Sequence, residues 1–211
     1  MEKEKKYLFL GLFFVFIQIV AIIRNVSSGY NNFFWFCDFA SLPIAIGFFL
    51  KKDDFVKSIV NIGLFPQIIY ILAFVYKIFS GVSILETIPD TSTIFYFTSS
   101  IIIHLSTIFA LCFTYKTKPR ISTLFHSIMF IFGMYVIALF FTNPQDRINY
   151  VLSSRTLLPI TIPYYTELWS LLTFLIVVLP TQGIQYLIYR YYEKNEGKKK
   201  VLNTKSKKEA L

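Results

Sequence analysis

Charged residues are scarce in this chain and cysteine is almost absent. Only 16% of the 211 residues are charged, while 55% are hydrophobic and two are cysteines. Soluble domains carry about 25% charged residues, and here the charges are clustered, with long uncharged runs between them. Segments of about ten alternating apolar and polar residues, which are typical of membrane β-barrels, are also missing. The composition therefore predicts a helical membrane protein and argues against a soluble domain.

Motifs that bind nucleotides or metals are missing as well. The sequence has no P-loop, no G-x-G-x-x-G, no H-E-x-x-H and no C-x-x-C. Its two histidines and two cysteines are spread over four different depths, a poor arrangement for a metal site. We expect no metal and no soluble cofactor.

The net charge of +9 does not indicate a nucleic-acid partner. The basic residues lie at the ends of apolar runs and in a lysine-rich tail, without a nucleic-acid-binding motif between them. That distribution is typical of residues that set the topology of a membrane protein. We expect membrane lipids as partners and no nucleic acid; the sequence contains no signal for an oligomeric state.

Six apolar runs approach the ~20 residues that cross a bilayer as a helix. They predict an all-α membrane protein, a bundle of six transmembrane helices in one domain over residues 1–192. A basic, disordered cytoplasmic tail is expected over residues 193–211. The predicted spans are Tyr7–Ile23, Phe33–Leu50, Phe55–Phe79, Thr93–Tyr115, Ile121–Thr142 and Thr166–Arg190.

The basic residues also predict the orientation. They gather at the N-terminus, in the second loop (where we count Lys57 with Lys51 and Lys52), in the fourth loop and in the tail. The opposite side has Arg24, Arg147 and Arg155. The positive-inside rule then places both termini in the cytoplasm of a multi-pass cell-membrane protein.

The second run contains a thiol and a carboxylate side by side, Cys37 and Asp38. A carboxylate within a membrane span is costly and usually marks a functional site or a buried pair. Asp38 points about 100° away from Cys37 on a helix, which favours pairing with Arg24 or Arg147. Arg24 is otherwise an interfacial anchor or a contact for a lipid head group. Pro43 is expected to kink the helix just below the thiol.

The fourth run carries a polar stripe of Ser100, His104 and Thr107, which share one helix face. Cys37 and His104 are thus a candidate nucleophile and base, because an imidazole that takes the thiol proton leaves a thiolate able to attack an acyl carbon. The alternative is a core cysteine and a hydrogen-bonded core histidine. Asn61 and Gln67 of the third run are interpreted as interhelical hydrogen-bonding residues or as an oxyanion site.

Three short segments resemble the TMEM164/YwaF family of integral membrane proteins. They are FWFCDFASL in the second run, SSIIIHLSTIF in the fourth and RINYVL after the fifth. The family has a compact multi-helix fold and includes a lipid acyltransferase with a membrane Cys and His. The chain is also similar in outline to the androgen-induced membrane hydrolases of fatty-acid esters, which use Thr and His. The resemblance implies Cys37 as nucleophile, His104 as base, and Asn149 and Tyr150 in the outer wall of a site.

Two functions remain open at this point. One is acyl transfer or hydrolysis on a lipid ester, with Asp38, Asn61, Gln67, Asn149 and Tyr150 around the substrate. The other is a non-catalytic protein, such as a small transporter, channel subunit or partner-binding protein. In that case Asp38, His104, Asn61 and Gln67 would form a buried network or a path for protons or solute.

Overall fold

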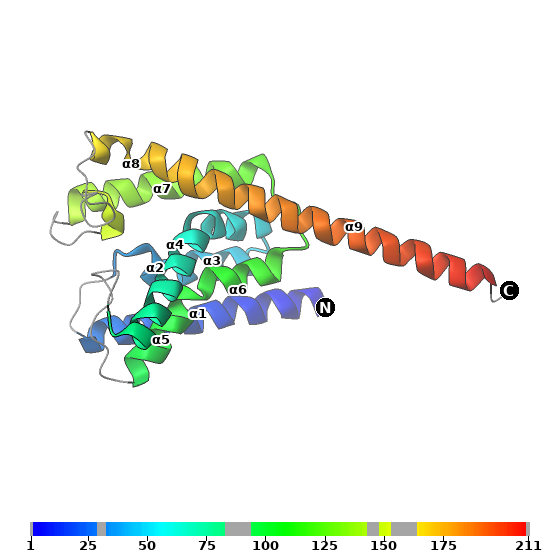
Figure 1. Cartoon of the computed structure of the whole chain (residues 1–211), viewed down its shortest axis with the longest axis horizontal. Coiled ribbons are helices and arrows are strands. Elements are labelled where there is room, and N and C mark those ends of the chain that lie inside the picture. The colour runs from blue at the N-terminus through cyan, green and yellow to red at the C-terminus, as the bar shows by residue number, and fades with distance from the viewer. Residues whose placement is uncertain (1, 29–32, 83–93, 143–147, 153–163, 210–211) are drawn as a thin grey trace.

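The computed structural model describes residues 2–28, 33–82, 94–142, 148–152 and 164–209, with side chains up to residue 197 except those of Ser28 and Tyr150. Helices make up nearly all of these residues, and none of them forms a strand (Figure 1). The elements are α1 (Glu2–Ser28), α2 (Phe36–Phe39), α3 (Ser41–Phe49), α4 (Asp53–Ser80), α5 (Ile94–His104), α6 (Ser106–Thr114), α7 (Ile121–Phe141), η2 (Ile148–Tyr150), α8 (Tyr165–Thr173), η3 (Phe174–Val178) and α9 (Leu179–Glu209).

The helices have the length and composition of membrane spans. Five are long and apolar enough to cross a bilayer: α1, α4, α5 with α6, α7, and α8 continued through η3 into α9. Large apolar side chains are exposed on their outer faces, among them Phe9 and Phe16 of α1 and Phe132 and Phe140 of α7. Such faces are stable in lipid and costly in water. The predicted class, an all-α multi-pass membrane protein, is confirmed.

The second predicted span differs from expectation. Instead of one helix over Phe33–Leu50, the structure has two short helices that together cover Phe36–Phe49, less than the length of a full span. Asn149 explains where α2 starts: its side chain accepts a hydrogen bond from Phe36 N at 2.8 Å and donates one to Phe34 O at 3.0 Å. The aromatic residues before Phe36 are therefore held outside the helix.

Both termini lie at the same end of the molecule (Figure 1). Contacts at this end join parts distant in sequence: Lys51 pairs with Glu4 at 2.8 Å, and Tyr7 donates to Asp53 at 2.9 Å. The chain must cross the bundle an even number of times to return to this end. The segment α2–α3 therefore completes the sixth crossing although it is short.

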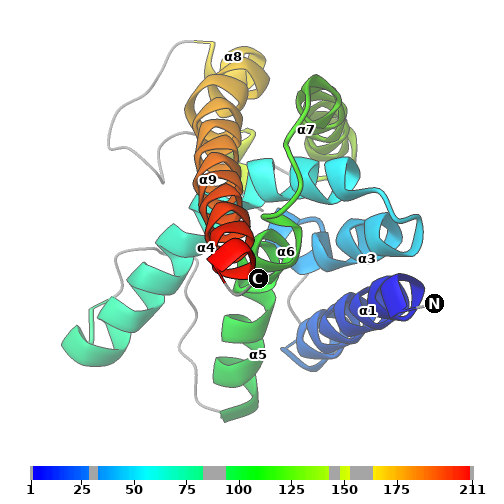
Figure 2. The same ribbon diagram turned by 90° about the vertical axis from the view of Figure 1, so that its right-hand side faces the viewer.

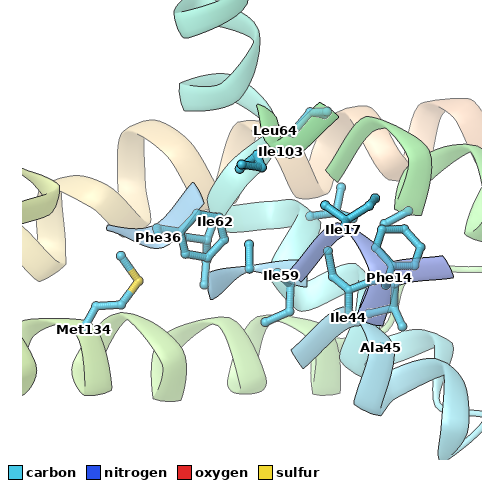
Figure 3. Close-up of a cluster of buried hydrophobic side chains, with 14 of the residues drawn as sticks. Phe14, Ile17, Phe36, Ile44, Ala45, Ile59, Ile62, Leu64, Ile103 and Met134 are labelled. Atoms are coloured by element: carbon cyan, nitrogen blue, oxygen red, sulfur yellow. The ribbon is translucent and has the colours of Figure 1, made fainter. Parts of the chain in front are cut away.

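Helix α4 runs obliquely between the other helices, as the view from the terminal end shows (Figure 2). It contacts α3, α6, α7 and α9. Its Ile59 and Ile62 belong to a core in which Phe14 and Ile17 of α1 meet Ile44 of α3 (Figure 3). Most of the buried polar groups described below therefore lie on α4 or against it.

The last helix departs from a regular α-helix before Pro180. The segment η3 is a π-helix, and it ends two residues before this proline, which has no N–H to donate. Helix α9 then continues to Glu209. The segment predicted to be a disordered tail therefore has a helical backbone as far as Glu209.

Candidate functional site

Cys37 and Asp38 lie in α2, just before a break in the helical hydrogen bonding at Ala40. The amide of Gln18 on α1 is inserted at this break. Gln18 Nε2 donates to Asp38 O at 2.8 Å, and Leu42 N donates to Gln18 Oε1 at 3.1 Å. Asp38 O and Leu42 N are the partners that an uninterrupted helix would join directly. Gln18 therefore fixes the two residues relative to α1, and the break lies three residues before Pro43, where the kink was expected.

Asp38 forms an ion pair with Arg24, and both side chains are only 3% exposed. This confirms Arg24 as the counter-charge of Asp38 rather than an interfacial anchor; Arg147, the other partner considered, lies outside the described residues. Arg24 Nη1 also donates to Ser100 Oγ at 3.1 Å, and its guanidinium lies 5.5 Å from the centroid of the Tyr96 ring. A buried pair needs such additional partners, because attraction alone rarely offsets the loss of hydration.

The direction of α1 explains this pairing. Side chains of a helix tilt toward its N-terminus, and α1 begins at the end that holds both termini. Arg24, one turn from the other end of α1, therefore points back into the bundle toward Asp38.

The thiol of Cys37 contacts the same carboxylate. Cys37 Sγ lies 3.6 Å from Asp38 Oδ2. The two side chains were expected to point in different directions, but in the structure they are in contact. Asp38 thus receives hydrogen bonds from both Cys37 and Arg24.

His104 ends α5 and is buried. Its Nδ1 lies 2.8 Å from Ser100 O, and its ring stacks on Tyr70 of α4 with 3.6 Å between the centroids. A carbonyl oxygen can only accept, so Nδ1 carries a proton, and in the neutral form of the ring Nε2 keeps its lone pair.

The structure does not join the predicted nucleophile to the predicted base. Among the described residues Cys37 and His104 share no hydrogen bond. They are connected indirectly, because Arg24 binds Asp38 on the side of Cys37 and binds Ser100 on the side of His104. What the sequence suggested as a pair is in the structure two parts of one buried cluster around Arg24. We call Arg24, Asp38, Cys37, Ser100 and His104 the outer cluster.

Asn149 lies next to the outer cluster, and the contacts that fix the start of α2 place it there. It adopts φ 47°, a left-handed conformation that asparagine tolerates, and its carbonyl accepts from Trp169 Nε1 at 3.2 Å. The backbone of Tyr150 follows in η2, and its side chain lies outside the described part.

Gln67 bridges a second break, between α5 and α6 at Leu105. Its Oε1 accepts from Thr107 N at 3.1 Å and from Thr107 Oγ1 at 2.7 Å, and its Nε2 donates to Ser106 Oγ at 3.2 Å. Both the oxygen and the nitrogen of the Gln67 amide are therefore hydrogen-bonded. The amide lies one turn of α4 before Tyr70, which stacks on His104. Like Gln18, it accepts from a backbone N–H at a helix break, but its Nε2 donates to a side-chain hydroxyl and not to a backbone carbonyl.

Asn61 belongs to a separate cluster nearer the terminal end. Its Nδ2 donates to Gln182 Oε1 at 2.8 Å and to Ser127 Oγ at 3.2 Å, and its Oδ1 accepts from Gln185 Nε2 at 2.7 Å. Neither Asn61 nor Gln67 hydrogen-bonds to Cys37 or His104 in the described part. Their contacts agree with the prediction that they form hydrogen bonds between helices. We call the cluster of Lys57, Asn61, Ser127, Gln182 and Gln185 the inner cluster.

Sequence reasoning misses or misjudges three residues in or next to these clusters. Lys57 was counted as a loop charge, yet its side chain is 0% exposed. Gln18 and Gln185 received no role. The signal available for the glutamines is an amide within an apolar run, and for Lys57 it is a position two residues inside the span predicted to start at Phe55.

Within the described residues, no group of three or more His, Cys, Asp or Glu is placed to hold a metal ion. No protein-family model, no curated protein and no solved structure matches this chain.

Proposed function

We propose that this membrane protein is non-catalytic and moves protons, alone or together with a small solute, through the outer cluster. The proposal depends on one observation, the buried ion pair of Arg24 and Asp38. Ionisable side chains within membrane spans often serve as proton relays. The pair is also connected to a second titratable group, since Ser100 binds both Arg24 and His104.

The proposed step is the protonation of Asp38. A proton that binds the carboxylate removes its charge and leaves Arg24 without a counter-charge. The ion pair then opens, and its groups become available to water or solute. Inward of His104, the amide of Gln67 and the hydroxyls of Ser106 and Thr107 extend the polar residues along α4. The protein would act in the cell membrane, with lipid against its exposed apolar faces.

Proton flux into proteoliposomes tests this function. Purified protein is reconstituted with a pH-sensitive dye inside, and flux is driven by a potassium gradient with valinomycin. We expect flux above that of empty vesicles, its loss in Asp38→Asn, and its retention in Cys37→Ser. Asp53→Asn is the matched control, because Asp53 is a carboxylate bonded to Tyr7 at the other end of the bundle. Flux that is equal in Asp38→Asn and wild type, or absent from folded wild type, contradicts the proposal.

A second candidate is acyl transfer or hydrolysis on a lipid ester by Cys37 and His104. The tautomer of His104 favours it, because the bond of Nδ1 to Ser100 O leaves Nε2 as a base. The thiol would have to exchange its contact with Asp38 for one with Nε2. Asn149 and Tyr150 would then lie beside the substrate, as the family resemblance implies.

Intact mass before and after neutral hydroxylamine tests this candidate. A hydroxylamine-sensitive acyl adduct in the wild type, and none in Cys37→Ala, supports a thioester. Wild-type protein with an unmodified mass and no turnover on a panel of lipid esters excludes it.

A further inference from the structure

Lys57 is a buried amine that forms no ion pair within the described part of the chain. Its only hydrogen bond in the described structure goes from Nζ to Gln185 Oε1 at 3.5 Å, at the upper limit for such a bond. None of the described carboxylates forms an ion pair with it. An ammonium group has three N–H donors, and burial of a charge that lacks an ion-pair partner is unfavourable.

The rest of the inner cluster is satisfied without Lys57. Gln185 Nε2 donates to Asn61 Oδ1 and to Lys57 O, and Asn61 Nδ2 donates to Gln182 and Ser127. Gln182 Nε2 in turn donates to Arg120 O at 3.2 Å. A bound anion or solute would have to displace these bonds, whereas a proton on Nζ displaces none of them. The proton is therefore the ligand that fits the cluster as it is packed.

The charged groups nearby are placed to receive the amine once it is protonated. Asp53 and Asp54 lie one turn away on α4 and act on Lys57 electrostatically. Asp53 holds Tyr7 of α1, and Asp54 holds Ser122 and Arg120 at the start of α7. His126 of α7 packs against Phe55. Helix α9 faces Lys57 with the uncharged Gln185, α3 has no titratable residue, and α6 has only the exposed Cys112.

We propose that Lys57 is a proton-binding site of the inner cluster, neutral while α4 packs against Gln185 of α9. Uptake of a proton from water forms an N–H bond with the lone pair of Nζ. The resulting ammonium breaks from Gln185 and turns toward Asp53 and Asp54, so protonation loosens the contact between α4 and α9. This inference does not rest on the outer cluster or on proton transport.

Thermal unfolding as a function of pH, in nanodiscs of fixed lipid composition, tests the site. Above about pH 8 the unfolded chain carries Lys57 protonated and the folded chain does not, so unfolding takes up a proton and stability rises with pH. Between about pH 8 and pH 10, we expect the unfolding constant of the wild type to fall by up to about tenfold more per pH unit than that of Lys57→Met. Lys52→Met, which removes an exposed lysine of the neighbouring turn, should keep the wild-type dependence.

Three further results decide the proposal. Lys57→Arg, which is always charged, should be less stable than Lys57→Met, and the reverse order overturns the inference. If Lys57→Met does not fold, Lys57→Gln replaces it, because it is uncharged and keeps a donor toward Gln185. Parallel pH curves for wild type and the uncharged variant, or stabilisation of the wild type alone by added phosphate, also overturn it; the phosphate result would indicate an anion site.

Discussion

At the scale of single residues, neutral amides and one ion pair decide how the polar groups are buried. Gln18 and Gln67 each bind the backbone at a break in a neighbouring helix, one beside Cys37 and Asp38 and the other beside His104. Lipid offers no hydrogen bonds to such backbone groups, so protein side chains must provide them. These two glutamines allow the helix breaks that place the thiol, the carboxylate and the imidazole in the interior.

The Arg24–Asp38 pair gives a prediction about stability. Arg24→Met leaves Asp38 charged and unpaired inside the bundle, and breaking a buried pair in this way costs about 3–5 kcal/mol. The double variant Arg24→Met/Asp38→Leu removes both charges and should recover most of this loss. Unfolding in mixed micelles measures the free energies. A double variant no more stable than Arg24→Met would contradict this account of the pair.

At the scale of elements, close contact between helices depends on a few glycines. A Cβ atom at Gly63 of α4 would lie 2.4 Å from Cε1 of Phe36 and 2.7 Å from Cγ2 of Thr107. Gly63 thus allows α4 to approach both α2, which holds the site, and α6. A Cβ atom at Gly133 of α7, by contrast, would have none of the described neighbours within 4 Å.

These two glycines form a matched pair for a test of helix packing. Gly63→Ala should destabilise the protein by about 1–3 kcal/mol, because Phe36 must shift to make room for the methyl group. Gly133→Ala should cause no loss, since alanine favours a helix more than glycine does. The same unfolding assay compares them. Equal effects of the two substitutions would show that α2 and α4 are not packed as described.

At the scale of the whole molecule, both termini lie at one end, and five helices of the described part have the length of a full span. The short segment α2–α3 therefore reaches less far than its neighbours toward the opposite end. As a result, Cys37 and Asp38 lie deeper than the end of α1, and Asp38 is within reach of Arg24.

The sidedness predicted from the basic residues can be measured with single cysteines in a Cys37→Ser/Cys112→Ala background. Ser80→Cys, at the end of α4, should react with an impermeant maleimide on intact cells. Lys118→Cys, before α7, should react only after the cells are opened. Both positions are exposed, so access to the reagent depends on the side of the membrane. Labelling in the opposite order would reverse the orientation.

The sequence by itself determined that this is a helical multi-pass membrane protein, because the length and polarity of each apolar run are local properties that lipid selects directly. It also predicted Arg24 or Arg147 as the partner of Asp38, since a buried charge requires an opposite one. Only the tertiary structure decided which polar groups meet. The start of α2 depends on Asn149 over a hundred residues away, and His104 faces Tyr70 and Ser100 rather than Cys37. Lys57 is buried because Gln185 of the last helix packs over it, a contact that no local pattern around Lys57 contains.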